Sequence, residues 1–278
     1  MMNSKPFSNQ RWRFIDQTTY GPQFQALQSF AYDDALCTAI GTADEADSVL
    51  RAWVHHDTVV LGIQDSRLPC IAEGVAYLKE QGYDVIVRNS GGLAVVLDDQ
   101  VLNLSLLLKE NHKISISHGY EVMVHLIESV LSSYSASIKA GEVIGSYCPG
   151  SYDLSIEGKK FAGISQRRIR GGVAVQIYIS LATAHINRAE LIKTFYEKAT
   201  QGQPTAFDYP KINPNTMASL SELLDTDITV STFVHQLLTS MLQLGAELIP
   251  STLTDEEFKL YENQYARVME RNKKALQL

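Results

Sequence analysis

Arg88-Asn-Ser-Gly-Gly-Leu-Ala-Val-Val-Leu-Asp98 is the stretch of sequence that decides the fold. The apolar runs on either side of its glycine pair predict two strands, over residues 84–88 and 93–97. One interpretation is a hairpin turn, in which Gly91 and Gly92 adopt positive φ at no steric cost. The other is a binding site, where bare backbone lets an acyl chain lie against the strands and Arg88 binds a polar group nearby. The apolar strands suit such a chain better than they suit a phosphate.

The rest of the chain predicts an α+β fold with a mostly antiparallel sheet flanked by helices. Helices are expected over residues 23–41, 69–82 and 120–133. A strand pair joined at Asp57 is expected over 51–56 and 58–62, with further strands over 101–108, 151–157, 160–168 and 173–181. We expect one catalytic domain over 1–278: a core over 46–216 and a helical C-terminal portion over 217–278, packed on the core. Thr254 is the expected cap of the last helix.

A second motif places a cysteine shortly before a lysine. Cys148 stands in Gly145-Ser-Tyr-Cys-Pro-Gly-Ser-Tyr152, a stretch of small residues and tyrosines that predicts an open loop. Lys160 follows in Gly158-Lys-Lys-Phe-Ala-Gly163, and a turn at Gly158 would bring it back beside that loop. A thiol beside an ammonium is partly thiolate near neutral pH, the form that a nucleophile needs. Cys148 is therefore the candidate nucleophile.

Composition restricts the class of protein. The chain has 278 residues, 45% hydrophobic and 20% charged, with a formal net charge of −7. This acidic balance argues against nucleic acid as a partner. The first residues resemble no secretory signal, and no run is long and apolar enough to cross a membrane, so we expect no membrane partner. The cysteines, at 37, 70 and 148, form neither a disulfide framework nor a metal pair, which favours a cytoplasmic enzyme with reduced thiols.

Other candidate residues have simpler interpretations. Cys37 lies within an apolar helix and Cys70 at a helix start, where packing is the usual role of a thiol. The scattered histidines lack metal-ligand spacing, so no metal is expected. Arg167, Arg168 and Arg170 form either a solvated hairpin end or a docking patch for an acidic carrier domain.

The two motifs together resemble the lipoate-protein ligase and octanoyltransferase superfamily. The similarity lies in Arg-x-Ser-Gly-Gly-x-Ala-Val followed by Asp98, in Leu102-Asn-Leu-Ser105, and in the lysine motif, where Lys160 takes the position of the family lysine. It covers residues 46 to 181, with weaker agreement beyond. The resemblance implies a biotin/lipoate protein ligase-like fold. It also implies that the substrate-binding residues are Arg88, Ser90, Gly91, Gly92, Asn103 and Gly163.

Departures from the superfamily pattern indicate the branch. ATP-using ligases usually carry His before the Asp of the glycine motif, where this chain has Leu97. Octanoyltransferases of the proteobacterial type carry their cysteine after the lysine, and residues 172–178 contain none. A cysteine before the lysine resembles the Gram-positive branch, most closely the octanoyl-[GcvH]:protein N-octanoyltransferase (lipoyl amidotransferase) group.

This resemblance implies an acyltransferase without ATP, metal or other cofactor. Cys148 would take an octanoyl or lipoyl group from a lysine of the glycine cleavage H protein as a thioester, and pass it to a lysine of an E2 lipoyl domain of a 2-oxoacid dehydrogenase. Lys160 would favour the Cys148 thiolate, hold the acyl carbonyl oxygen, or both, with the Cys148 and Gly150 amides as further donors. The alternatives are an octanoyltransferase with acyl carrier protein as donor, an ATP-dependent ligase, and a carrier-binding protein without chemistry.

Overall fold

The structure is a computed structural model that describes residues 7–110, 115–184 and 187–276. Among these residues, strands form a large eight-stranded sheet and a small three-stranded one. The large sheet runs in the order β11 (Glu247–Pro250), β1 (Arg11–Gln17), β2 (Ser48–Val54), β6 (Val101–Lys109), β10 (Gly172–Ser180), β9 (Lys159–Ile169), β8 (Asp153–Ile156), β7 (Ile138–Ala140). Among the described strands of the large sheet, β1 alone pairs in parallel, with β2 and β11. The predicted α+β class with a mostly antiparallel sheet is confirmed.

The small sheet holds β3 (Thr58–Leu61) between β4 (Asp84–Val87) and β5 (Val95–Leu97). The predicted strand pair joined at Asp57 is therefore wrong, because β2 belongs to the large sheet and β3 to the small one. Asp57 has φ +35, and the turn around it carries the chain from one sheet to the other. The glycine motif lies between β4 and β5, so its two strands flank β3 and do not pair with each other.

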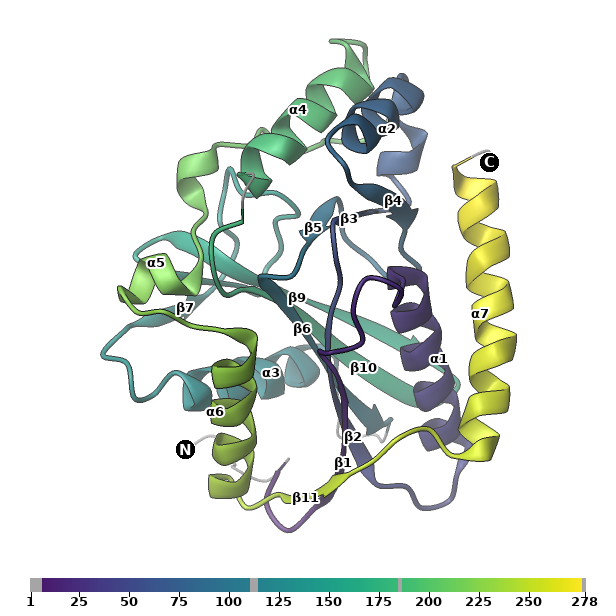
Figure 1. Cartoon of the computed structure of the whole chain (residues 1–278), viewed down its shortest axis with the longest axis vertical. Coiled ribbons are helices and arrows are strands. Elements are labelled where there is room, and N and C mark those ends of the chain that lie inside the picture. Colours follow the sequence, from purple (N-terminus) through teal and green to yellow (C-terminus); the bar gives the residue numbers. More distant parts are fainter. Residues whose placement is uncertain (1–6, 111–114, 185–186, 277–278) are drawn as a thin grey trace.

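Helices cover both faces of the large sheet (Figure 1). On one side α1 (Ala26–Thr42) lies against β6 and β10, and α7 (Asp255–Ala275) packs along α1. On the other side lie α3 (Ile116–Val130) and α6 (Val230–Gln243), which contact each other. The short α5 (Leu220–Leu224) precedes α6, while α2 (Ile71–Glu80) and α4 (Arg188–Thr200) pack together over the small sheet. Because both faces are covered, every residue of β10 is buried.

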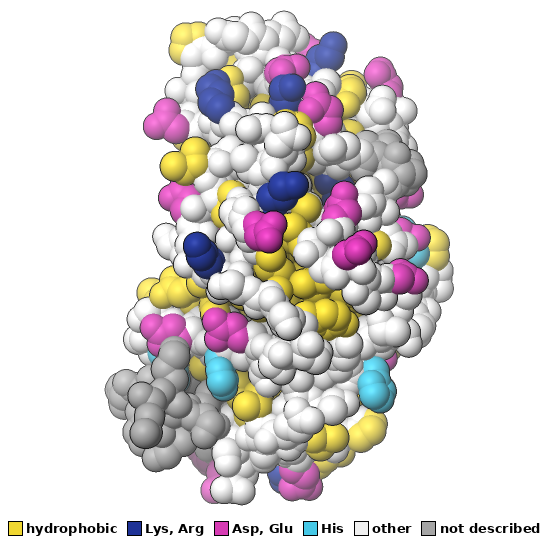
Figure 2. Space-filling model, turned by 90° about the vertical axis from the view of Figure 1, so that its left-hand side faces the viewer, with side chains coloured by type: hydrophobic (Ala, Val, Ile, Leu, Met, Phe, Trp, Pro, Cys, Tyr) yellow, Lys and Arg dark blue, Asp and Glu magenta, His cyan; other side chains and the backbone are white. Residues whose placement is uncertain are grey.

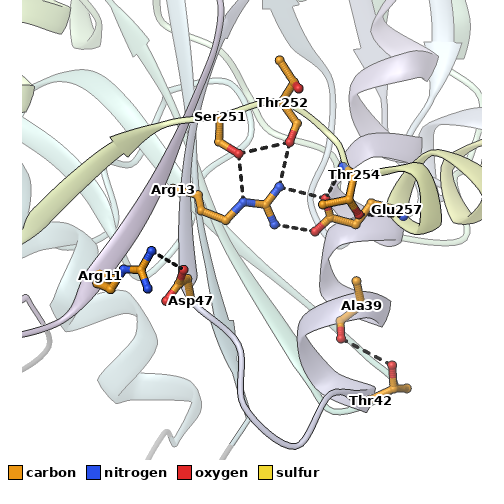
Figure 3. Close-up of polar contacts among 9 residues, drawn as sticks. All are labelled: Arg11, Arg13, Ala39, Thr42, Asp47, Ser251, Thr252, Thr254 and Glu257. Atoms are coloured by element: carbon orange, nitrogen blue, oxygen red, sulfur yellow. Dashed lines mark hydrogen bonds and ion pairs between the residues drawn. The ribbon is translucent and has the colours of Figure 1, made fainter.

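An ion pair joins the first strand to the last helix (Figure 3). Arg13 of β1 donates to Glu257 of α7 at 2.8 Å and to Ser251 Oγ at 3.0 Å. Glu257 also closes a capping box with Thr254, the predicted cap. Farther along α7, Asn272 Oδ1 accepts a hydrogen bond of 2.8 Å from the backbone N–H of Val87, the last residue of β4. The C-terminal helix is thus tied to both sheets.

Some elements differ from the predictions. The sequence pattern did not predict β1, β7 or α4. The C-terminal portion is not wholly helical, because it contains β11. β11 pairs with β1, so the first and the last described strands are neighbours in the large sheet. Among the described residues of the face shown in Figure 2, acidic and basic side chains are interspersed around hydrophobic ones, so the charge there is not of one sign.

Candidate active site

The two predicted motifs meet at the thiol of Cys148. This residue lies in the loop between β7 and β8, in the left-handed conformation with φ +44, and is partly buried. Its Sγ accepts a hydrogen bond from the backbone N–H of Leu93 at 3.2 Å and lies 3.4 Å from Arg88 Nη2. The glycine motif therefore supplies the donors that face the thiol. A guanidinium and an amide both favour a thiolate.

Lys160 lies beside the same loop but is bound to other atoms. The turn at Gly158, with φ +78, lets β9 pair with β8 and returns Lys160 to the Cys148 loop, as predicted. The side chain is fully buried, and its Nζ donates to the carbonyl oxygens of Tyr147 at 2.9 Å and Cys148 at 2.8 Å. Its third contact is Asp153 Oδ1 at 2.9 Å. Since an ammonium has three N–H donors, these contacts use all of them.

Asp153 completes the support of the loop and was not predicted. Besides pairing with Lys160, it accepts from the backbone N–H of Gly150 at 3.2 Å and of Val143 at 3.3 Å. Burial raises the pKa of Asp153 above its ordinary value, against the opposing effects of Lys160 and these amides. The Gly150 amide, an expected donor to the substrate, is thus engaged by Asp153. The sequence signal was present, because Asp153 directly follows the cysteine motif.

A cavity of about 390 Å³ opens beside Cys148. Its floor is one row of the large sheet, in which directly paired residues follow one another across β2, β6, β10, β9 and β8. We call it the pocket row: Trp53, Asn103, Tyr178, Gly163 and Asp153. Directly paired residues point to the same face of a sheet, and all five line the cavity.

All the predicted substrate-binding residues line this cavity: Arg88, Ser90, Gly91, Gly92, Asn103 and Gly163. Their roles in binding stay predictions. At two of these positions, Gly92 and Gly163, a side chain would collide with a neighbouring residue. A Cβ on Gly92 would lie 2.9 Å from Arg88 Nη1, and a Cβ on Gly163 would lie 2.8 Å from the ring of Tyr178. Gly92 thus makes room for the guanidinium, and Gly163 for the tyrosine ring.

Among the other described residues that line the cavity, none is a charged side chain without a partner. Phe30, Val60, Val95 and Leu97 contribute apolar surface, and Ser29, His55 and Gln176 contribute polar atoms. Burial lowers the pKa of His55 to about 3, so its ring is neutral. His55 Nδ1 lies 2.9 Å from the Phe24 carbonyl, which can only accept, so Nε2 is the acceptor for the Ser29 hydroxyl at 2.9 Å. Such a cavity suits an uncharged chain whose polar end lies at Cys148.

The arginine cluster divides between two environments. Arg167 pairs with the buried Asp34, with Nη2 2.8 Å from Oδ2, and donates to the Asn89 carbonyl at 3.0 Å. It therefore helps to hold the start of the glycine motif. Arg168 pairs with Glu110 at 2.5 Å, and Arg170 is exposed at the hairpin turn with φ +48. The docking role proposed for these residues stays a prediction.

The other cysteines lie away from Cys148. Cys37 is buried in α1, where burial raises the pKa of its thiol well above the ordinary value. Cys70 precedes α2, and its Sγ accepts from Gln203 at 3.1 Å. Within the described ranges, no cluster of His, Cys, Asp and Glu could hold a metal ion, and no helix is long and apolar enough to cross a membrane.

Comparison with known proteins gives consistent matches. The family model of the lipoyl protein ligase A/B catalytic domain matches residues 25–242. Octanoyl-[GcvH]:protein N-octanoyltransferase of Geobacillus kaustophilus is 54% identical over 96% of this chain and 94% of its own length, and the enzyme of that name from Anoxybacillus flavithermus is 54% identical over 99% of both. Lipoyl-[GcvH]:protein N-lipoyltransferase of Listeria monocytogenes is 51% identical over 95% of both chains.

Solved structures share the fold at low identity. Lipoate-protein ligase A bound with ATP superposes with a TM-score of 0.72 at 17% identity, over 96% of this chain and 99% of that one. The bipartite lipoate protein ligase of Thermoplasma acidophilum gives a TM-score of 0.68 at 17% identity, over 94% and 93%. These likenesses establish the architecture alone.

Proposed function

Because the chain belongs to the lipoyl protein ligase A/B catalytic domain family, as its motifs predicted, we propose that it is an acyltransferase acting between protein lysines. It moves an octanoyl or lipoyl group from the H protein of the glycine cleavage system to the lipoyl domains of 2-oxoacid dehydrogenase E2 subunits. Relatives that match nearly the whole chain are transferases of both acyl groups from GcvH. The observation that carries the proposal is that Cys148 lines a largely apolar cavity, with Arg88 and the Leu93 amide beside its thiol.

The reaction is proposed to proceed through a thioester on Cys148. Its sulfur bonds to the carbonyl carbon of the acyl-lysine amide, and the C–N bond breaks. The thiol proton goes to the departing lysine nitrogen, which leaves as a free amine. In the second half, the amine of the acceptor lysine bonds to the thioester carbon, the C–S bond breaks, and the proton that the amine loses goes to the departing sulfur. The thiol is regenerated, and one amide has been exchanged for another.

This exchange requires no ATP, because the amide that breaks and the amide that forms have nearly equal energies. We propose no cofactor for the same reason. The nucleophile has to remain a reduced thiol, which supports a cytoplasmic location.

In this proposal Arg88 and Lys160 have separate duties. The Arg88 guanidinium and the Leu93 amide stabilise negative charge on the sulfur before attack. Lys160 binds the carbonyls on both sides of the left-handed Cys148 residue, and so fixes the loop that aims the thiol. Asp153 neutralises this buried ammonium. The lysine would thus position the nucleophile.

Intact mass spectrometry tests the proposal. The protein is incubated separately with octanoyl-H protein and with octanoyl-acyl carrier protein, then weighed before and after neutral hydroxylamine, which cleaves thioesters. We expect one octanoyl adduct from octanoyl-H protein that hydroxylamine removes, and none with Cys148→Ala. Adduct formation from acyl carrier protein alone would identify the other donor. Transfer that depends on ATP and free octanoate would identify a ligase.

A further inference from the structure

Trp53 is the end of the pocket row on the side away from Cys148. The cysteine stands over the other end: a Cβ on Gly163 would lie 3.5 Å from Lys160 Cε, and the Nζ of that lysine is 2.8 Å from the Cys148 carbonyl oxygen. From Gly163 the row crosses β10 and β6 before it reaches Trp53 in β2. Trp53 lines the cavity, whereas its paired residue in the next strand, Gln17 of β1, does not. The cavity floor therefore stops at the side chain of Trp53.

A buried arginine holds the indole ring of Trp53 in place. The guanidinium carbon of Arg51, two residues earlier in the same strand, lies 3.8 Å from the ring centroid. Arg51 is fully buried, and it donates to Asp33 Oδ1 at 2.9 Å, to Gln17 Oε1 at 2.6 Å and to the Ser29 carbonyl oxygen at 3.0 Å. A guanidinium on an aromatic face is attractive, most of all when both are shielded from water. The ring therefore cannot leave its place without disturbing this buried network.

The length of the row matches an acyl chain of eight carbons. Neighbouring strands lie about 4.8 Å apart, so the row from Gly163 to Trp53 spans about 14 Å. An extended chain advances about 1.2 Å per bond, so an octanoyl thioester reaches about 10 Å from the sulfur to its terminal methyl group. This leaves about 4 Å between the methyl carbon and Trp53, the usual separation of apolar groups in contact. Two further CH₂ groups would run into the ring.

The polar groups beside Trp53 are satisfied by the protein itself. Ser29 Oγ and His55 Nε2 lie 2.9 Å apart, and His55 Nδ1 lies 2.9 Å from the Phe24 carbonyl oxygen. Buried polar groups that already have partners offer little to a ligand, and the His55 ring is neutral. The chain terminus that fits this end of the cavity is therefore an apolar one, and a terminal carboxylate would be buried there without a partner.

We propose that Trp53 sets the length of the acyl group that the protein accepts, because its ring closes the cavity about one octanoyl chain away from Cys148. This inference rests on the proposed function, in which Cys148 carries the acyl group. Up to the ring, each CH₂ group that enters the cavity should strengthen binding by about fourfold. A longer chain has to fold back or displace the ring, and the gain is then lost. Trp53 is a specificity-determining residue and takes no part in the bond changes at the sulfur.

Competition among small thioesters tests this role without a carrier protein. The protein is given an equimolar mixture of hexanoyl, octanoyl, decanoyl and dodecanoyl thioesters of N-acetylcysteamine. Cys148 Sγ bonds to the acyl carbon, the thioester C–S bond breaks, and N-acetylcysteamine leaves with the thiol proton; intact mass then identifies the bound chain. The wild type should favour octanoyl over dodecanoyl by about tenfold or more. Trp53→Phe, which keeps a smaller ring on Arg51, should accept decanoyl, and Trp53→Ala should favour dodecanoyl.

Leu104→Ala is the matched control. Leu104 directly follows Asn103 in β6, so it points to the opposite face of the sheet; it is fully buried and does not line the cavity. Its loss should lower the melting temperature, as the loss of the Trp53 ring does, but leave the preference for octanoyl unchanged. A second readout avoids acylation: protection of Cys148 from iodoacetamide by 1-alkanols of the same lengths should shift in the same order.

Two results would overturn the inference. One is a preference for octanoyl, and for 1-octanol, that stays the same in both Trp53 variants. The other is an equal shift toward longer chains in Leu104→Ala, which would make the shift a consequence of a loosened fold. Failure of the wild type to take the acyl group from octanoyl-H protein would instead contradict the proposed donor, while the thioesters and alkanols would still decide the role of Trp53.

Discussion

Cys148 Sγ lies 3.4 Å from a guanidinium nitrogen of Arg88, a residue sixty positions earlier in the chain. The ammonium of Lys160, only twelve positions away, instead binds the Cys148 carbonyl oxygen. The cation nearest in sequence therefore supports the backbone of the nucleophile, and a distant one contacts its sulfur. From the cysteine–lysine spacing we expected Lys160 to favour the Cys148 thiolate, but in the structure Arg88 contacts the sulfur and Lys160 does not.

Arg88→Gln should slow alkylation of Cys148 at neutral pH by about tenfold, because the guanidinium nitrogen that lies 3.4 Å from the sulfur is lost. The rate at high pH, where every thiol is ionised, should match the wild type. Arg67→Gln, which alters an exposed arginine, is the control and should have no effect. Iodoacetamide kinetics across pH make the comparison. A neutral-pH rate that falls in Lys160→Ala but not in Arg88→Gln would return the duty to the lysine.

Lys160→Ala should destabilise the protein by about 3–5 kcal/mol, because it leaves the Asp153 carboxylate buried and unpaired. Its neighbour Lys159 is exposed, so Lys159→Ala should change neither stability nor activity. Urea denaturation measures both variants. Adding Asp153→Asn to Lys160→Ala should recover part of the loss, since the uncompensated charge is then gone. Equal losses in the two lysine variants would contradict the assignment.

Gly92→Ala should cost about 1–3 kcal/mol, because φ is +109 there and residues with side chains rarely adopt such values. The new methyl would also displace the Arg88 guanidinium, so acylation should fall. Gly91→Ala is the adjacent comparison: a Cβ there meets nothing within 4 Å, and stability should be unaffected. Thermal unfolding of the two variants decides. A loss in Gly91→Ala as large as that in Gly92→Ala would mean that the whole loop is packed more tightly than the structure indicates.

Acid should weaken the fold through His55. Its pKa is lowered to about 3 by burial, whereas the unfolded chain takes up a proton near its ordinary value of about 6.5. The stabilisation is complete above that ordinary value and is lost as pH falls toward 3. Relative to His55→Gln, the wild type should lose about 2 kcal/mol between pH 7 and pH 5. Urea unfolding at several pH values measures this, and a difference that does not vary with pH would exclude His55 as the cause.

Arg170→Glu should raise the KM for octanoyl-H protein, more at low than at high salt, since exposed charges are screened over about 10 Å at 0.1 M. Alkylation of Cys148 should not change. Arg167→Glu should behave differently, because it places a carboxylate against Asp34 and disturbs the glycine motif. Its stability and alkylation rate should both fall. Steady-state kinetics at two salt concentrations distinguish the variants, and a salt-independent effect of Arg170→Glu would argue against docking at the hairpin.

Local sequence patterns were sufficient to predict the fold class and the two motifs that meet at Cys148. They did not predict the elements whose structure depends on pairing with distant segments. β1 alternates charged and apolar residues and owes its place to β2 and to β11 at the other end of the chain. The apolar runs around Asp57 resemble a hairpin locally, but their partners, β6 and β4, put them in different sheets.

The sequence predicted which residues form the candidate site better than it predicted which atoms these residues contact. Spacing brought Lys160 back to the cysteine loop, but it could not show which atoms of Cys148 the ammonium meets. The pocket row as a whole was not predicted, because residues such as Asn103, Tyr178 and Gly163 become neighbours only when their strands pair in the sheet.

The tie between α7 and β4 bears on when the protein becomes competent during its biosynthesis. Asn272 near the C-terminus accepts from Val87, directly before Arg88, and β11 supplies an edge strand of the large sheet. A nascent chain translated only as far as α6 already contains Cys148, Lys160 and Arg88. It still lacks the strand that pairs with β1 and the helix that anchors the glycine motif. The residues of the site are therefore translated well before β11 and α7, the two segments that hold β1 and the start of the glycine motif in place.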